Sequence, residues 1–193
     1  MGFEMAKGPL MTVNGEWQIS VFYDGVAEAI ALQYGDINTG EVYCRIHSSC
    51  ITAHVFGSIE CDCREQMDLS MKAIREQGSG VIIYLDQEGR SNGNYAHIAT
   101  QSLKREGFPQ SVAYEKLGFP RDNRDYSLAI KVLKEMKINN LILLSNNPEK
   151  LKALADANLN VRKHSRPISI LPDNAYLKKQ YLDKKEVDGH YLD

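Results

Sequence analysis

Three of the chain's four cysteines lie within the fourteen positions CITAHVFGSIECDC, residues 50 to 63. Cys50, Cys61 and Cys63 offer thiolates, which zinc prefers together with imidazole nitrogens. Three thiolates without an obvious fourth ligand favour an open zinc site, where a water molecule can be activated for hydrolysis at neutral pH. Two alternatives stay open. His54 could complete a closed structural site, or the cysteines could bind no metal.

Composition argues against disulfide bonds and against several classes of partner. The chain has 193 residues, 43% hydrophobic and 25% charged, which is enough for one domain with its own core. We see no apolar run near the roughly 20 residues that span a membrane and no apolar core of a signal peptide. We therefore expect a cytoplasmic protein with reduced thiols and no membrane partner. A net charge of −2 argues against a nucleic-acid partner.

Three loops combine side chains that suit anions and nucleotides. They are RIHSS (45–49), DQEGRSNG (86–93) and SNNPEK (145–150). Arg45, Arg90 and Lys150 could bind phosphate, and Gly89 allows a close approach of the backbone to a ligand. Each loop alone is a weak signal, since an isolated cation is usually solvated. The chain has no Walker A pattern and no complete G-x-G-x-x-G, so an ordinary nucleotide-binding fold is not indicated.

Hydrophobic periodicity predicts a mixed α/β protein that positions these loops. Strands are expected at 16–23, 29–35, 41–48, 81–85 and 141–145. Helices are expected from Asp62 to about Gln77, then at 95–106, 122–137 and 149–157. N-terminal strands followed by alternating helices and buried strands indicate a single α/β domain over residues 1–193. We expect Cys44 to be a core residue, and residues 1–12 and 174–193 to be flexible tails.

Five motifs, taken in order, resemble a known enzyme family. They are RIHSSC, CDCREQ, QEGRSNG, LGFPRDNRDY and LLSNNPEK. Together they resemble GTP cyclohydrolase II, the first committed enzyme of riboflavin synthesis, from about Tyr34 to the C-terminal YLDKKEVDGH. The resemblance implies one catalytic domain with zinc on Cys50, Cys61 and Cys63. It also implies attack at C8 of GTP, opening of the imidazole ring, and release of formate and of pyrophosphate with the help of Mg²⁺. The family usually forms homodimers.

The resemblance also assigns residues by position. It implies that Asp122 is a proton acceptor and that Arg124 acts at the α-phosphate, as a nucleophile or by stabilising charge. A structural alternative is that Asp122 caps a helix N-terminus. We expect Glu88 to accept from the N–H groups of guanine, and Arg45 and Lys150 to bind phosphates. The expected GTP contacts are Arg45, Ile46, His47, Ser48, Ser49, Gln66, Glu88, Gly89, Arg90, Gln110, Ser145 and Lys150.

Several positions depart from the family pattern. Ser49 replaces a common glutamate, Arg64 a glycine, Asp86 a basic residue, Gln101 a tyrosine and Gln110 a threonine. Because these changes are expected near the pocket, two alternatives to the ordinary reaction remain. The protein could be a divergent enzyme that stops at a formamidopyrimidine nucleotide or uses another purine nucleotide. It could also be a non-catalytic GTP-binding protein with structural zinc.

Overall fold

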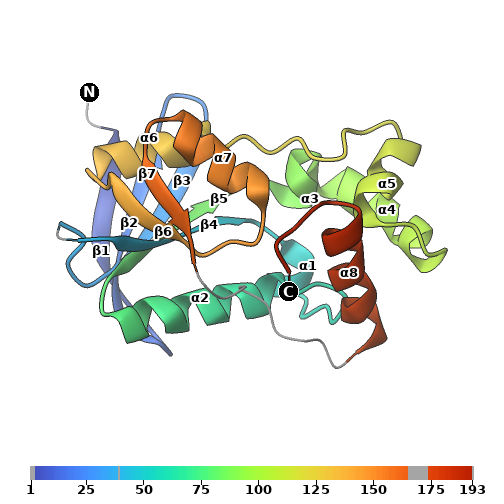
Figure 1. The fold of residues 1–193 in the computed structure, drawn as a ribbon, viewed down its shortest axis with the longest axis horizontal. Coiled ribbons are helices and arrows are strands. Elements are labelled where there is room, and N and C mark those ends of the chain that lie inside the picture. Colours follow the sequence, from blue (N-terminus) through green and yellow to red (C-terminus); the bar gives the residue numbers. More distant parts are fainter. Residues whose placement is uncertain (1–2, 39, 165–173, 193) are drawn as a thin grey trace.

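The computed structural model describes residues 3–38, 40–164 and 174–192 of the chain. They form one mixed sheet with helices on both faces, which confirms the expected α/β class (Figure 1). The strands are β1 (Glu4–Thr12), β2 (Gly15–Tyr23), β3 (Glu28–Tyr34), β4 (Val42–Ser48), β5 (Gly80–Leu85), β6 (Asn140–Leu143) and β7 (Asn160–Lys163). Their order across the sheet is β1-β2-β3-β5-β4-β6-β7.

The sheet has an antiparallel part and a parallel part. The pairs β1–β2, β2–β3 and β3–β5 are antiparallel, whereas the pairs β5–β4, β4–β6 and β6–β7 are parallel. Parallel strands end at the same edge of a sheet, and ligands in such folds bind beyond the carboxyl ends of the strands. The loops that follow β4, β5 and β6 therefore meet at one edge, which is where the sequence concentrates its polar motifs.

The helices divide between the sheet faces and this edge. They are α1 (Ile51–His54), α2 (Cys63–Gln77), α3 (Glu88–Ser91), α4 (Gly93–Arg105), α5 (Gln110–Lys116), α6 (Ser127–Glu135), α7 (Pro148–Asp156) and α8 (Ala175–Glu186). In Figure 1, α2 covers one face, α6 and α7 cover the other, and α3, α4, α5 and α8 gather beyond the strand ends. Within the described residues, no helix is both long and apolar enough to cross a membrane.

Alternation along β4 explains how a core strand also serves the site. Val42, Cys44 and Ile46 are at most 2% exposed and pack in the cluster that α6 and α7 complete, which confirms Cys44 as a core residue. Arg45 and His47 point to the opposite face, as the period of two requires. There they are covered by the start of α2 and by the loops, so both polar side chains are buried.

Two expectations about the N-terminal half and about α6 are corrected. Residues 4–12 are not a flexible tail, because they form β1 and pair with β2 around the two-residue turn Val13–Asn14. The expected helix at 122–137 begins only at Ser127, where Asp125 Oδ1 accepts the Ser127 N–H at 2.9 Å. Asp122 therefore does not cap this helix, and its Oδ1 accepts the N–H of Arg124 instead.

The C-terminal expectation is corrected as well. Residues 175–186 form α8, and Asn174 caps it by accepting the N–H of Leu177 at 2.9 Å. Beyond the helix, the N–H of Tyr191 donates to Asn146 O at 2.8 Å, and Leu192 is only 3% exposed. The chain end thus packs against the loop that follows β6. Local sequence does not indicate this arrangement, because α8 has no apolar stripe and is held by polar contacts.

Candidate active site

A cavity of about 350 Å³ opens at the edge where β4, β5 and β6 end. Its walls come from the three loops, from the start of α2, and from α4, α5 and α8. All the expected GTP-contacting residues line it except Ile46, whose side chain is fully buried in the core. The sheet topology thus gathers motifs that lie up to a hundred residues apart in the chain.

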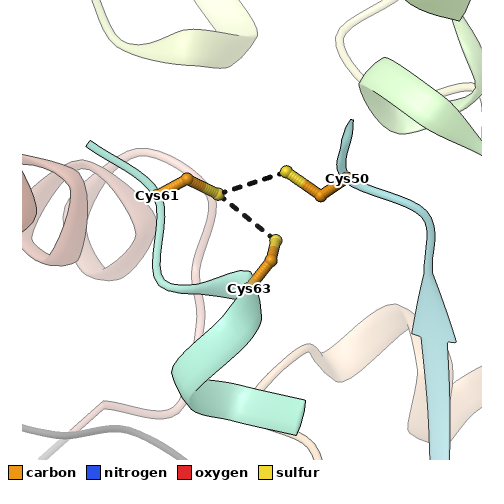
Figure 2. Close-up of side chains that lie close together, drawn as sticks. All are labelled: Cys50, Cys61 and Cys63. Atoms are coloured by element: carbon orange, nitrogen blue, oxygen red, sulfur yellow. Dashed lines mark hydrogen bonds between the residues drawn. The ribbon is translucent and has the colours of Figure 1, made fainter. Parts of the chain in front are cut away.

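The three cysteines form one wall of this cavity (Figure 2). Cys61 Sγ lies 3.6 Å from Cys50 Sγ and 3.3 Å from Cys63 Sγ, and all three sulfurs lie within 4.8 Å of one another. Ligands 2.3 Å from a tetrahedral zinc ion would lie about 3.8 Å apart, so the cluster fits this metal. Hydrogen bonds from Cys61 and Cys63 lower the pKa of Cys50 to about 3, whereas the contacts with Cys50 and Cys61 and burial raise the pKa of Cys63.

His54 does not join the cysteine cluster. Among the described residues, the group that could hold a metal contains only the three cysteines. The Nε2 atom of His54 lies 3.2 Å from Nε2 of His47 instead. Arg45 is a donor only, so its contact with Nδ1 of His47 requires the Nε2–H tautomer of His47, which donates to His54. The closed Cys₃His site therefore has no support in the geometry.

Two buried basic side chains, Arg45 and Lys150, lie in the cavity without an anionic partner among the described residues. They are 5% and 4% exposed. Arg45 donates to Leu144 O at 2.9 Å and to the side chain of Gln66, and Lys150 Nζ donates to Ile46 O at 2.8 Å. Neither forms a salt bridge in the part of the chain that the structure describes.

The pKa values of both side chains show that burial without a carboxylate disfavours their charged forms. Burial lowers the pKa of Arg45 to about 10. Burial and the nearby charges of Arg45 and Arg124 hold the pKa of Lys150 well below its usual range. Buried charges are normally paired, because the loss of hydration otherwise destabilises the fold. A site that keeps converging cations without a carboxylate is suited to an anionic ligand such as a phosphate chain.

Asp122 and Arg124 lie at the boundary of the cavity. Arg124 lines it, whereas Asp122 lies outside, in a neighbouring hollow with Glu149 and Lys152. Arg124 Nε donates to Asp122 Oδ1 at 2.8 Å, so the two form an ion pair. Burial opposes ionisation of Asp122, but the Arg124 contact lowers its pKa below the usual value. The pair presents a guanidinium to the cavity and keeps its carboxylate behind it.

The loop after β5 turns in a left-handed conformation. Gly89, Arg90 and Ser91 have φ values of 61°, 58° and 66°. Glycine adopts this region freely, whereas arginine and serine do so at a cost of about 1 kcal/mol or more each. The turn directs Arg90 into the cavity, where its Nη2 donates to Asp188 Oδ2 at 2.6 Å. Asp188 follows α8, so the C-terminal segment supplies the carboxylate for this arginine.

Several residues that the sequence did not suggest also line the cavity. The most connected is Asp62, between two cysteines, which accepts from Gln66 Nε2 at 2.7 Å and from Lys184 Nζ at 2.6 Å. His97 and Tyr114 enter from α4 and α5. No local pattern marks these contacts, because each partner comes from a distant part of the chain. The one sequence feature that could have indicated such contacts is the segment rich in Lys and Asp near the C-terminus, which includes Lys184.

Some departures from the family pattern lie in the cavity and others lie outside it. Ser49 lines the cavity, and its Oγ donates to Asp86 Oδ1 at 3.1 Å. Arg64 is exposed, and neither it nor Gln101 lines the cavity. The Gln101 side chain instead bonds within α4, where its Oε1 accepts from Lys104 at 3.3 Å.

The remaining expected contacts are engaged with their neighbours. Gln110 Nε2 donates to Thr100 Oγ1 at 2.7 Å, and Ser145 Oγ accepts the N–H of Asn147 at 3.1 Å. Ser48 Oγ lies 3.4 Å from an oxygen of Gln87. These bonds fix the directions of polar groups that line the cavity.

Comparisons with known proteins agree with this arrangement. A family model described as GTP cyclohydrolase II matches residues 4–166. A protein named GTP cyclohydrolase-2 from Buchnera aphidicola subsp. Acyrthosiphon pisum is 41% identical over 166 residues, which cover 84% of each chain. The riboflavin biosynthesis protein RibBA of Bacillus cereus (strain ATCC 10987 / NRS 248) is 45% identical over 135 residues, which cover 69% of this chain.

This chain matches only 34% of the length of that RibBA protein. A solved structure, the two-domain 3,4-dihydroxy-2-butanone 4-phosphate synthase RibBX from A. baumannii, aligns with a TM-score of 0.49 at 16% identity. That alignment covers 84% of this chain and 40% of RibBX. The assignment therefore rests on the family match and the sequence relatives, and by these the chain belongs to the GTP cyclohydrolase II family.

Proposed function

We propose that the protein opens the imidazole ring of GTP by hydrolysis at C8 and releases formate and pyrophosphate. One observation supports this above all others. A cluster of three thiols and two buried cations without anionic partners share one cavity. A metal at one end and an anion-binding surface at the other suit a substrate with both a purine ring and a phosphate chain. The name of the Buchnera relative supplies the identity of that substrate.

Cys50, Cys61 and Cys63 would hold a zinc ion in this proposal. Bound there, zinc would supply a Lewis acid that makes water reactive at neutral pH. Asp62 supports the site from between the ligands, since it is tied to α2 through Gln66 and to α8 through Lys184. Such contacts behind a metal site orient the ligands.

The phosphate end rests on cations of this chain. Arg45 and Lys150 would bind phosphate oxygens, and their lack of carboxylate partners leaves their charge available. Arg124 faces the same cavity and would stabilise charge at the α-phosphate when pyrophosphate leaves with Mg²⁺. Asp122 holds the Arg124 guanidinium toward the cavity and, as the resemblance implies, would accept a proton during the phosphate-release step.

The base end would be bounded by Glu88 and the loop before Cys50, while Arg90, near enough to Asp122 to lower its pKa, would face the phosphate chain. Glu88 lines the cavity, but it is 8% exposed and both its oxygens already accept hydrogen bonds from the protein. Any contact with guanine N–H groups would use its remaining lone pairs. Its carboxylate orientation is therefore fixed before substrate arrives. A cytoplasmic location and a homodimer remain predictions.

The experiment is a full product analysis. Purified protein with stoichiometric zinc would be incubated with GTP and Mg²⁺, and formate, pyrophosphate and the purine product would be quantified by mass spectrometry and enzymatic assays. We expect formate and pyrophosphate in equal amounts, and none from a Cys61→Ser variant. A formamidopyrimidine triphosphate that accumulates without formate would contradict the proposal in favour of a divergent enzyme. Intact GTP bound to zinc-loaded protein would contradict it in favour of a binding protein.

A further inference from the structure

The carboxylate of Glu88 joins two loops of the site. Its Oε2 accepts the backbone N–H of Ile51, next to the metal-site residue Cys50, at 2.7 Å. Its Oε1 lies 2.7 Å from Nδ1 of His97 and accepts the N–H of Gly89 at 3.3 Å. One buried side chain thus connects the cysteine loop, the turn after β5 and helix α4.

The turn that Glu88 begins needs such support. Arg90 and Ser91 adopt left-handed backbone conformations that other residues than glycine rarely take. Residues in such conformations persist only where the surrounding structure holds them. The carbonyl of Arg90 accepts the N–H of Asn123 at 3.0 Å, which holds the far end of the turn. The near end is held by Glu88 and its partners.

His97 is the side chain of helix α4 that bonds to the Glu88 carboxylate. It is 8% exposed, and it packs so closely under the turn that a Cβ on Gly89 would lie 2.9 Å from His97 Cβ. The carboxylate is an acceptor, so Nδ1 of His97 must carry the proton of this contact. In the described residues, no other side chain bonds to the Glu88 carboxylate. Its rotamer is therefore held by two backbone N–H groups and by one side chain, His97.

We propose that His97 is a positioning residue of the active site. By holding Glu88, it keeps the Cys50 loop and the Arg90 turn in the relative placement that the reaction needs. This inference rests on the proposed function for its catalytic consequence. Its structural consequence, the retention of metal by the cysteine loop, can be measured without turnover.

Two isosteric amides separate this role from simple packing. Asparagine places an amide N–H near the position of histidine Nδ1, whereas glutamine places it near Nε2. His97→Asn should therefore keep the bond to Glu88, and His97→Gln and His97→Leu should lose it. Gln101→Ala is the matched control, because Gln101 lies one turn further along α4, where its side chain bonds to the backbone oxygen of His97 and to Nζ of Lys104 and does not reach Glu88.

Each variant would be assayed for GTP turnover and for the rate at which zinc passes to a chromogenic chelator. Loss of a contact behind a metal site typically costs about 10- to 100-fold in activity or metal affinity. We expect kcat to fall and zinc transfer to accelerate by such factors in His97→Leu and His97→Gln. His97→Asn and Gln101→Ala should stay within about threefold of the parent. Circular dichroism and thermal unfolding identify any variant that has not folded.

Three results would overturn the inference. One is a folded His97→Leu protein with parental kcat and zinc retention. Another is an asparagine variant no better than the leucine variant, which would mean that the Nδ1 contact is irrelevant. The third is a Gln101→Ala variant as impaired as His97→Leu. If the parent protein does not turn over GTP at all, the proposed function fails, and the zinc-transfer rates still decide the inference.

Discussion

Replacing Asp188 by asparagine should make the protein bind GTP more tightly. Asp188 Oδ2 accepts a hydrogen bond from Arg90 Nη2 at 2.6 Å, and the two side chains are only 14% and 17% exposed. Arg90 lines the cavity and is an expected substrate contact. An anionic group of the substrate must therefore compete with the Asp188 carboxylate for this guanidinium.

The size of the effect follows from the contact that is weakened. Burial raises the pKa of Asp188, yet the hydrogen bond and charge of Arg90 lower it overall, so the carboxylate is ionised at neutral pH. A hydrogen bond between charged groups in a shielded site contributes about 1.5–3 kcal/mol. Asparagine keeps an acceptor oxygen but loses the charge, so we take about half of this, roughly 1.1 kcal/mol. That corresponds to about a sixfold decrease in Kd for the nucleotide.

The measurement is the affinity for inorganic triphosphate and for a GTP analogue with a non-hydrolysable α,β bridge. Isothermal titration calorimetry on zinc-loaded protein gives Kd without turnover, and KM for GTP should fall in parallel. Triphosphate reports on the phosphate end alone. The control is Asp183→Asn, which removes the same charge from the wall formed by α8. Asp183 forms an ion pair with Lys179 one turn away in a part-buried contact within α8, and no hydrogen bond or ion pair in the described part of the chain links it to Arg90, so its effect should stay within about twofold.

Two outcomes would contradict this reasoning. If Asp188→Asn raises Kd for triphosphate, the C-terminal segment helps to form the binding-competent state and does not compete with substrate. If Asp183→Asn strengthens binding equally, the gain comes from net charge and not from the freed guanidinium. In either case the proposed role of Arg90 toward an anionic substrate group would have to be abandoned or moved to another cation.

Three further predictions concern the metal, a buried cation and the turn. Cys63→Ser should lose stoichiometric zinc, measured by inductively coupled plasma mass spectrometry. Lys150→Met should abolish triphosphate binding and raise the free energy of unfolding by about 1–3 kcal/mol, since it removes a buried unpaired charge. Burial holds the pKa of Lys150 in the folded chain well below 10.5. The unfolded chain therefore binds more protons from the folded-state pKa up to 10.5, so stability rises with pH in that window, and Lys150→Met should reduce the slope measured by urea titrations at pH 9 and 10. Gly89→Ala should lower the free energy of unfolding by about 1–3 kcal/mol and reduce GTP turnover. The φ of residue 89 is 61°, and the new Cβ would lie 2.9 Å from His97 Cβ.

The sequence was informative where a periodic pattern and a loop coincide. The apolar runs at 81–85 and 141–145 predicted β5 and β6, and the polar residues that follow them line the cavity as expected. The cysteine spacing likewise identified a cluster whose sulfurs meet. In these places local chemistry and topology agree, because parallel strands deliver their following loops to one edge.

The sequence was uninformative where contacts between distant segments determine structure. Helix α8 has no apolar stripe, and it is held by the pair of Lys184 with Asp62 and by the segment beyond it. Strand β1 depends on pairing with β2. Neither kind of support can be deduced from local propensity, which is a weak guide when tertiary contacts decide. The same reason hides the bond between Glu88 and His97, whose partners must first be brought together by the left-handed turn.

The structure also changes what the departures from the family pattern imply. Ser49 and Asp86 are two of these departures, and they are in direct contact. Ser49 Oγ donates to Asp86 Oδ1 and accepts the N–H of Gln87. Changes at residues in direct contact are usually not additive in energy, so the two substitutions form one coupled pair beside the cavity. Arg64 and Gln101 do not line the cavity. Inside the pocket the departures are then Ser49 and Gln110, while the three thiols and the two buried cations keep the residue types that the resemblance implies. Differences from the relatives should therefore appear in KM for GTP before they appear in the identity of the products.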